Sequence, residues 1–91
     1  MFIKILDSAK KHGLTETEIT NAVNQILFSK TKKDKNGKFV HMAVGMLPNG
    51  KTCELMYYIC ESKNGYIVFH AMSPAKNNFI KSVQQRKKKK G

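Results

Sequence analysis

Histidine, tyrosine, glutamate and lysine side chains are the groups of this 91-residue sequence that could act on a phosphodiester. Cleavage of RNA without a metal needs a base for the 2′-hydroxyl, a cation for the charge on the phosphate oxygens, and an acid for the leaving oxygen. Histidine suits the base and the acid because imidazole exchanges protons near neutral pH. Lysine suits the cation. The candidate catalytic residues are His70, His41, Tyr58, Lys76 and Glu54.

Two Asn-Gly pairs place some of these candidates, because such pairs between apolar runs are strong hairpin signals. If the first pair, at 49–50, is a two-residue turn, His41 opposes Tyr58 on neighbouring antiparallel strands. Glu54 then lies on the same face, some distance along it. That face mixes polar, aromatic and small side chains, so we expect a shallow floor that the C-terminal helix could partly cover. The alternative is that these residues are ordinary, partly exposed polar groups.

The other histidines and Lys76 have different expected surroundings. His70 falls on the apolar face that packs on helices, near the end of the sheet, where it could reach solvent or stay a hydrogen-bonded core residue. Lys76 follows the last strand, where it could hold a phosphate or remain solvated. His12 precedes a glycine helix stop, so its expected role is to cap the helix and interact with its dipole.

Lysines are also concentrated in the loops. A solvated loop and a track for a phosphate backbone are equally good interpretations of this pattern. The candidate RNA-binding residues are Lys30, Lys32, Lys33, Lys35, Lys38 and Lys51.

The two cysteines have no expected partner. Cys53 and Cys60 fall on one expected strand, roughly 23 Å apart. That distance is too long for a disulfide, and the spacing does not suit metal ligands. The sequence therefore predicts two free thiols, with no cofactor and no metal.

Apolar residues at helical spacing predict two N-terminal helices, one over 2–12 that stops at Gly13 and one from Thr15 to about residue 27 or 28. Thr15 and Glu18 have the spacing of a capping box. Three antiparallel strands are expected over 39–46, 53–60 and 66–72, residues 28–33 could add a short fourth strand, and a short helix should cover 75–85. The expected fold is α+β, with two N-terminal helices packed on a three- to four-stranded antiparallel meander and a short C-terminal helix. One domain would span 1–83, and 84–91 would form a basic, flexible tail.

The net charge of +11 indicates a polyanionic partner. Five of the 17 basic residues lie at 86–90, so the rest of the chain keeps 12 basic against 6 acidic residues, or +6. Arg86 is the one arginine, which favours attraction to a phosphate backbone over the reading of bases. No apolar run is long enough to span a bilayer or to act as a secretion signal, so we expect a soluble, cytoplasmic protein without a membrane partner.

A family resemblance rests on an ordered set of short motifs. The chain has Lys11-His12-Gly13 followed by a Glu-rich second helix, a strand that ends in Val44-Gly45, then Gly50-Lys51, and a last strand that ends near His70-Ala71. Over about residues 8–80 this order resembles the BrnT-type ribonuclease toxins of bacterial type II toxin–antitoxin systems, in the RelE-like superfamily. The resemblance implies a compact α+β endoribonuclease with RNA as substrate, either free or ribosome-bound mRNA, and a cognate antitoxin as partner. It also implies basic catalytic residues near the end of the last strand, where Met72 stands in place of the family's arginine.

Two further hypotheses compete with the ribonuclease toxin. The lysine excess and the lack of a clear triad also suit a non-catalytic module that binds RNA or DNA. A basic domain whose main role is to capture an acidic protein, with a sheet edge that accepts a strand, would fit the charge as well. An antitoxin would be such a partner, so this third hypothesis is compatible with the first.

Overall fold

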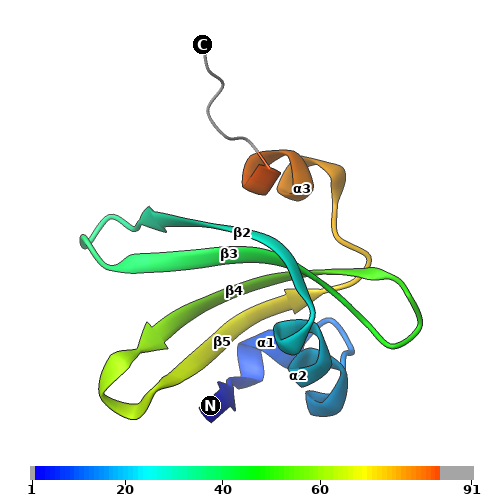
Figure 1. The fold of residues 1–91 in the computed structure, drawn as a ribbon, viewed down its shortest axis with the longest axis horizontal. Coiled ribbons are helices and arrows are strands. Elements are labelled where there is room, and N and C mark those ends of the chain that lie inside the picture. Colours follow the sequence, from blue (N-terminus) through cyan, green and yellow to red (C-terminus); the bar gives the residue numbers. More distant parts are fainter. Residues whose placement is uncertain (1, 85–91) are drawn as a thin grey trace.

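Residues 2–84, which the computed structural model describes, form one five-stranded sheet with helices on both faces (Figure 1). The strand order is β1-β5-β4-β3-β2, with β1 parallel to β5 and every other neighbouring pair antiparallel. In chain order the elements are β1 Phe2–Ile5, α1 Asp7–Lys10, α2 Glu16–Asn24, β2 Ile26–Lys33, β3 Phe39–Met46, β4 Thr52–Cys60, the 3-10 helix η1 Glu61–Lys63, β5 Gly65–Met72 and α3 Asn77–Gln84.

The predicted fold class was wrong in its N-terminal half. Residues 2–5 form a strand and not the first turns of a helix, and this strand makes the sheet mixed. Its four residues alternate between exposed and half-buried positions, which is the period of a strand. The second helix ends at Asn24, and residues 26–33 form a full edge strand where only a short one was expected. The capping box of Thr15 and Glu18 and the three central strands are confirmed within one residue.

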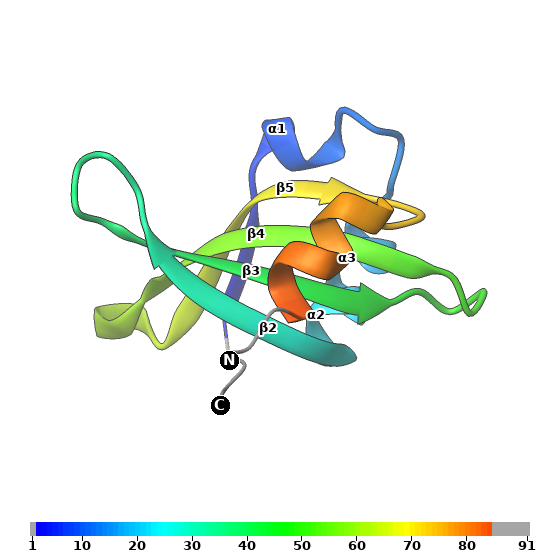
Figure 2. The ribbon, with the colours of Figure 1, turned by 90° about the horizontal axis from the view of Figure 1, so that it is seen from above.

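Two apolar layers lie on opposite faces of the sheet. Helix α2, with α1 beside β5, covers one face, and α3 lies across the other face over β2, β3 and β4 (Figure 2). The first layer contains Ile19 and Val23 of α2 against Leu55 and Val68 of the sheet. The second layer contains Met42 and Val44 of β3 against Val83 of α3. Gly45 allows the close approach of α2, because a Cβ there would lie 2.3 Å from the carbonyl oxygen of Ala22.

The first hairpin has a three-residue loop, Pro48–Gly50, in place of the predicted two-residue turn. The amide of Leu47 donates to the carbonyl of Lys51, the amide of Gly50 donates to the carbonyl of Leu47, and Gly50 has a φ of +87°. Glycine takes this left-handed position without strain, as in three-residue hairpins generally. The register therefore differs by one residue from the predicted one, and His41 pairs with Tyr57, not with Tyr58.

A bulge between β4 and β5 changes the expected faces again. On one side of it Tyr57 pairs with Val68, and on the other side Met56 pairs with His70, so β5 has one extra residue there. An extra residue shifts the alternation of side chains beyond it. Glu54 and His70 consequently share the face that carries α3, where the His70 ring lies near that of Phe79, although the predicted parity put them on opposite faces.

The β3–β4 ladder ends before the strands do. The last pair is His41 with Tyr57, yet β3 begins at Phe39 and β4 runs to Cys60. Beyond that pair, β3 stays bonded to β2 and β4 stays bonded to β5. The sheet thus opens into two diverging hairpins at this end (Figure 1).

The expected tail, 84–91, lies outside the described residues except for Gln84, the last residue of α3. No helix in the described part of the chain is long and apolar enough to cross a membrane.

Candidate functional site

Glu54 and His70 form a hydrogen-bonded pair between β4 and β5. The Nε2 atom of His70 lies 2.8 Å from Oε1 of Glu54. The second carboxylate oxygen, Oε2, accepts a hydrogen bond of 2.8 Å from the backbone amide of Lys76. The Glu54 side chain is 5% exposed and that of His70 is 24% exposed. The site is therefore a buried carboxylate that holds a histidine at the surface.

The connection from β5 to α3 is fixed next to this pair. Thr52 accepts a hydrogen bond on its carbonyl oxygen from the Ser73 hydroxyl, at 2.7 Å, and one on its Oγ1 from the amide of Ala75, at 3.0 Å. These bonds bring the amide of Lys76 to Glu54. A buried carboxylate is costly unless donors surround it, and this arrangement supplies two.

His12 is a second histidine at this site. Its ring lies edge-on to that of His70, with 5.7 Å between the ring centroids. Helix α1 brings it there, because the Ser8 hydroxyl donates a 2.8 Å hydrogen bond to the carbonyl of Phe69 and so ties α1 to β5. The predicted role of His12 as a helix cap did not include this contact.

An ionised carboxylate can only accept hydrogen bonds, so the tautomer of His70 that suits an ionised Glu54 has its proton on Nε2. When His70 is neutral, its Nδ1 then has a lone pair and can accept a proton. The pair can therefore act as a general base, with His12 beside it as a possible acid.

Three of the five predicted catalytic residues meet here, with one change of role. His70 and Glu54 meet through their side chains, but Lys76 contributes its backbone amide and its side chain is exposed. His41 and Tyr58 lie apart from this site. His41 stacks on Tyr57, with 5.4 Å between ring centroids, and its Nδ1 is 3.0 Å from the Thr31 hydroxyl. Tyr58 stacks on Phe69 at 4.8 Å.

The predicted RNA-binding lysines separate into three places. Lys30 is half-buried, and its Nζ donates a 3.0 Å hydrogen bond to the carbonyl of Ser82 near the end of α3, so it holds that helix on the sheet. Lys51 lies in the β3–β4 turn, at the end of the sheet opposite to the loop between β2 and β3 (Figure 1). The remaining four are exposed on the β2–β3 hairpin: Lys32, Lys33, Lys35 and Lys38.

Comparisons with protein-family models, with curated proteins and with solved structures found no match to this chain.

Proposed function

We propose that this protein is an endoribonuclease that cleaves RNA by general acid–base chemistry at Glu54, His70 and His12. The observation that carries the proposal is the 2.8 Å pair of His70 with the buried Glu54, together with the ring of His12 beside it. Two adjacent imidazoles suit a reaction that removes one proton and delivers another. The positive charge of the chain suits an RNA substrate.

In the proposed reaction, Nδ1 of His70 takes the proton of the 2′-hydroxyl. The 2′-oxygen attacks the neighbouring phosphorus, and the bond from phosphorus to the 5′-oxygen breaks. His12 gives a proton to that leaving oxygen. The products are a 2′,3′-cyclic phosphate and a 5′-hydroxyl end. Lys76, whose backbone amide bonds Glu54, has an exposed side chain, and its ammonium group offers a cation for the phosphate oxygens.

The biological role we propose is that of a toxin in a type II toxin–antitoxin pair. Its support is the resemblance to BrnT-type toxins, whose lysine-histidine-glycine opening contributes His12 to the site in this chain. The substrate would be mRNA, free or on the ribosome, and the protein partner would be a cognate antitoxin. Induced expression should stop bacterial growth, and His70→Ala should remove that effect at equal protein levels.

The enzymatic proposal is tested with purified protein and labelled RNA, with and without ribosomes. We expect cleavage that His70→Ala lowers about 10²- to 10⁴-fold, the usual contribution of a general acid or base. Lys4→Ala is the control, because Lys4 is exposed on β1, away from Glu54, His70 and His12, and its loss should leave the cleavage rate nearly unchanged. EDTA should not inhibit. If the protein binds RNA but does not cleave it, with or without ribosomes, the enzymatic proposal is wrong and the competing hypothesis of a non-catalytic RNA-binding module is favoured.

The Glu54–His70 pair could also serve only to fix the turn before α3, since Glu54 bonds the amide of Lys76. His70→Gln separates the two roles, because the glutamine amide nitrogen can take the place of Nε2 and donate a hydrogen bond to Glu54, but it cannot exchange a proton. A catalytic role requires His70→Gln to lose cleavage while the free energy of unfolding stays close to that of the wild type. Cleavage retained in His70→Gln would contradict the proposal.

A further inference from the structure

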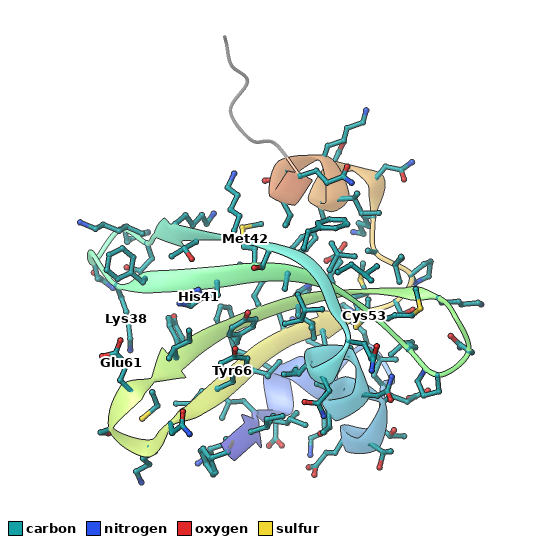
Figure 3. The ribbon with its side chains drawn as sticks, viewed as in Figure 1. Lys38, His41, Met42, Cys53, Glu61 and Tyr66 are labelled. Atoms are coloured by element: carbon teal, nitrogen blue, oxygen red, sulfur yellow. The ribbon has the colours of Figure 1, made fainter. Side chains whose placement is uncertain are left out.

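A cleft lies where the two hairpins diverge, at the end of the sheet beyond the His41–Tyr57 pair. Its volume is about 680 Å³, which is within the range of pockets that hold small organic ligands, roughly 300 to 1,000 Å³. Figure 3 shows Lys38 and His41 on the β2–β3 side of this opening and Glu61 on the β4–β5 side. The lining residues used below are Lys38, Phe39, His41, Tyr58 and Glu61.

Aromatic rings line the cleft without being buried in the core. Phe39 is 56% exposed although it is a large apolar residue. Tyr58 is half-buried, with one ring contact to Phe69 at 4.8 Å and the ammonium of Lys38 at 4.4 Å from its centroid. His41 is held in place by its stack on Tyr57 and its contact with Thr31. Exposed and half-exposed rings of this kind are what unpaired nucleobases stack on.

Positive charge surrounds these rings. The hairpin from Lys32 to Lys38 carries four exposed lysines and one acidic residue, Asp34. The ammonium of Lys33 is 5.4 Å from the centre of the Phe39 ring. Rings interleaved with lysines match a single strand of RNA, whose bases stack while its phosphates pair with cations. The outside of the cleft is thus suited to phosphate and its walls are suited to a base.

We propose that this cleft binds an unpaired nucleotide of the RNA substrate, with the base against Phe39 and Tyr58 and the phosphate at Lys33 and Lys38. The inference rests on the proposed function and adds to it a second contact, away from His70, that selects single-stranded RNA. A base within a duplex has both faces stacked on its neighbours and cannot enter. The strand would continue over Phe69, which stacks on Tyr58 and adjoins His70 in the chain.

Glu61 gives the cleft a preference among bases. Its carboxylate would repel a phosphate but accepts hydrogen bonds, as from the exocyclic amino group of cytosine. Uracil has an acceptor oxygen at that position and would leave Glu61 without a donor. The cleft should therefore favour cytidine over uridine, and Glu61→Gln should remove the difference, because the Gln amide can both accept and donate.

The test measures binding of labelled, 2′-O-methylated oligonucleotides of about eight nucleotides, a length that small single-strand-binding domains cover. The 2′-O-methyl group blocks cleavage, so binding is read separately from catalysis. We expect Phe39→Ala to weaken binding of oligocytidine about tenfold through loss of stacking. Lys38→Ala should weaken it less and should lower the slope of log affinity against log salt by about 0.7. A duplex of the same length should bind at least tenfold more weakly than the single strand.

Two matched variants control for the loss of an exposed apolar side chain and for the loss of one positive charge. Leu27→Ala removes a side chain of similar exposure, 51%, on β2 outside the cleft, and Lys4→Ala removes one exposed positive charge on β1. Binding that falls equally in Phe39→Ala and Leu27→Ala would contradict the proposal that the cleft binds an unpaired nucleotide. Equal binding of single strand and duplex would contradict it as well. An oligoglutamate peptide whose binding shows the same dependence on Phe39 would make the cleft a peptide site and would also overturn it.

The outcomes for the cleft and for the proposed function are distinguishable. If His70→Ala abolishes cleavage while the cleft variants bind as the wild type does, the catalytic proposal is supported and the inference about the cleft is contradicted. If the cleft variants lose binding but the wild type never cleaves RNA, the cleft stands and the catalytic proposal fails.

Discussion

At the scale of the residue, Glu54 has the least freedom of the charged groups described. Both of its carboxylate oxygens have a donor, and its side chain is 5% exposed. Glu54→Ala would leave the His70 ring and the Lys76 amide without their acceptor in a half-buried place, at a cost of about 1–3 kcal/mol for such unsatisfied groups. Glu54→Gln is the better functional probe, since it keeps the side chain's size and one acceptor oxygen.

The two thiols should differ strongly in reactivity. Cys53 is fully buried, and burial raises the pKa of its thiol to about 11, whereas Cys60 is partly exposed. Because the thiolate is the reactive form, a thiol reagent at about pH 8 should modify one cysteine of the native protein quickly and the second only on unfolding. Cys60→Ala should remove the fast phase. A fast phase that persists in Cys60→Ala would mean that Cys53 is accessible.

Tyr57 should make the fold sensitive to alkali. Burial, followed by the neighbouring Tyr66, raises its pKa to about 12 from an ordinary value near 10. The folded chain therefore holds this proton more tightly than the unfolded chain does. The resulting stability is fully present below about pH 10 and is lost as the pH rises to about 12, by up to roughly 1.4 kcal/mol per pH unit. Urea unfolding should show a shallower alkaline loss in Tyr57→Phe than in the wild type, and equal losses would contradict this account.

The candidate residues were easier to predict than their grouping. His70, Glu54 and Lys76 follow from the chemistry of their side chains, but the meeting of Glu54 with His70 depends on the bulge in β5 opposite Met56 and Tyr57. The partner of His41 depends on the three-residue loop at Pro48–Gly50. One residue more or less in a turn moves every later side chain to the other face. The Asn-Gly signal located the turn and left its length open, which is why His41 and Tyr58 were paired wrongly.

At the scale of the element, the first strand was the main error. The run from Phe2 to Ile5 is too short for its period to decide between helix and strand. What makes it a strand is its parallel pairing with Gly65–Val68, some sixty residues away in the chain. Local spacing cannot show such a pairing. The helix that begins after Thr15 was predictable because its capping box is local.

Gly45 is the element-scale position where we expect the largest effect of a small change. Gly45→Ala would push a Cβ to 2.3 Å from the Ala22 carbonyl oxygen, so α2 would have to move off the sheet. Overpacking of a core costs typically 1–3 kcal/mol. The midpoint of urea unfolding should fall accordingly. An unchanged midpoint would mean that α2 is not held as closely on β3 as the structure shows.

At the scale of the whole molecule, the proposed binding of RNA depends on the exposed lysines of the β2–β3 hairpin. Replacing Lys32, Lys33 and Lys35 with glutamine removes three exposed charges. For single-stranded RNA the slope of log affinity against log salt should then fall by about 2, at roughly 0.7 per phosphate contact. A slope that does not change would show that RNA lies elsewhere on the protein.

The central claim is that His70, oriented by Glu54, exchanges a proton with RNA while His12 exchanges another. The most direct test is the single-turnover rate of cleavage of a labelled RNA from about pH 5 to pH 9, where imidazoles exchange protons, for the wild type, His12→Ala and His70→Ala. We expect a bell-shaped profile and a 2′,3′-cyclic phosphate product for the wild type, the loss of one limb of the bell in His12→Ala, and almost no cleavage in His70→Ala. A wild-type profile that is flat over this range, or cleavage that survives in His70→Ala, would contradict the account.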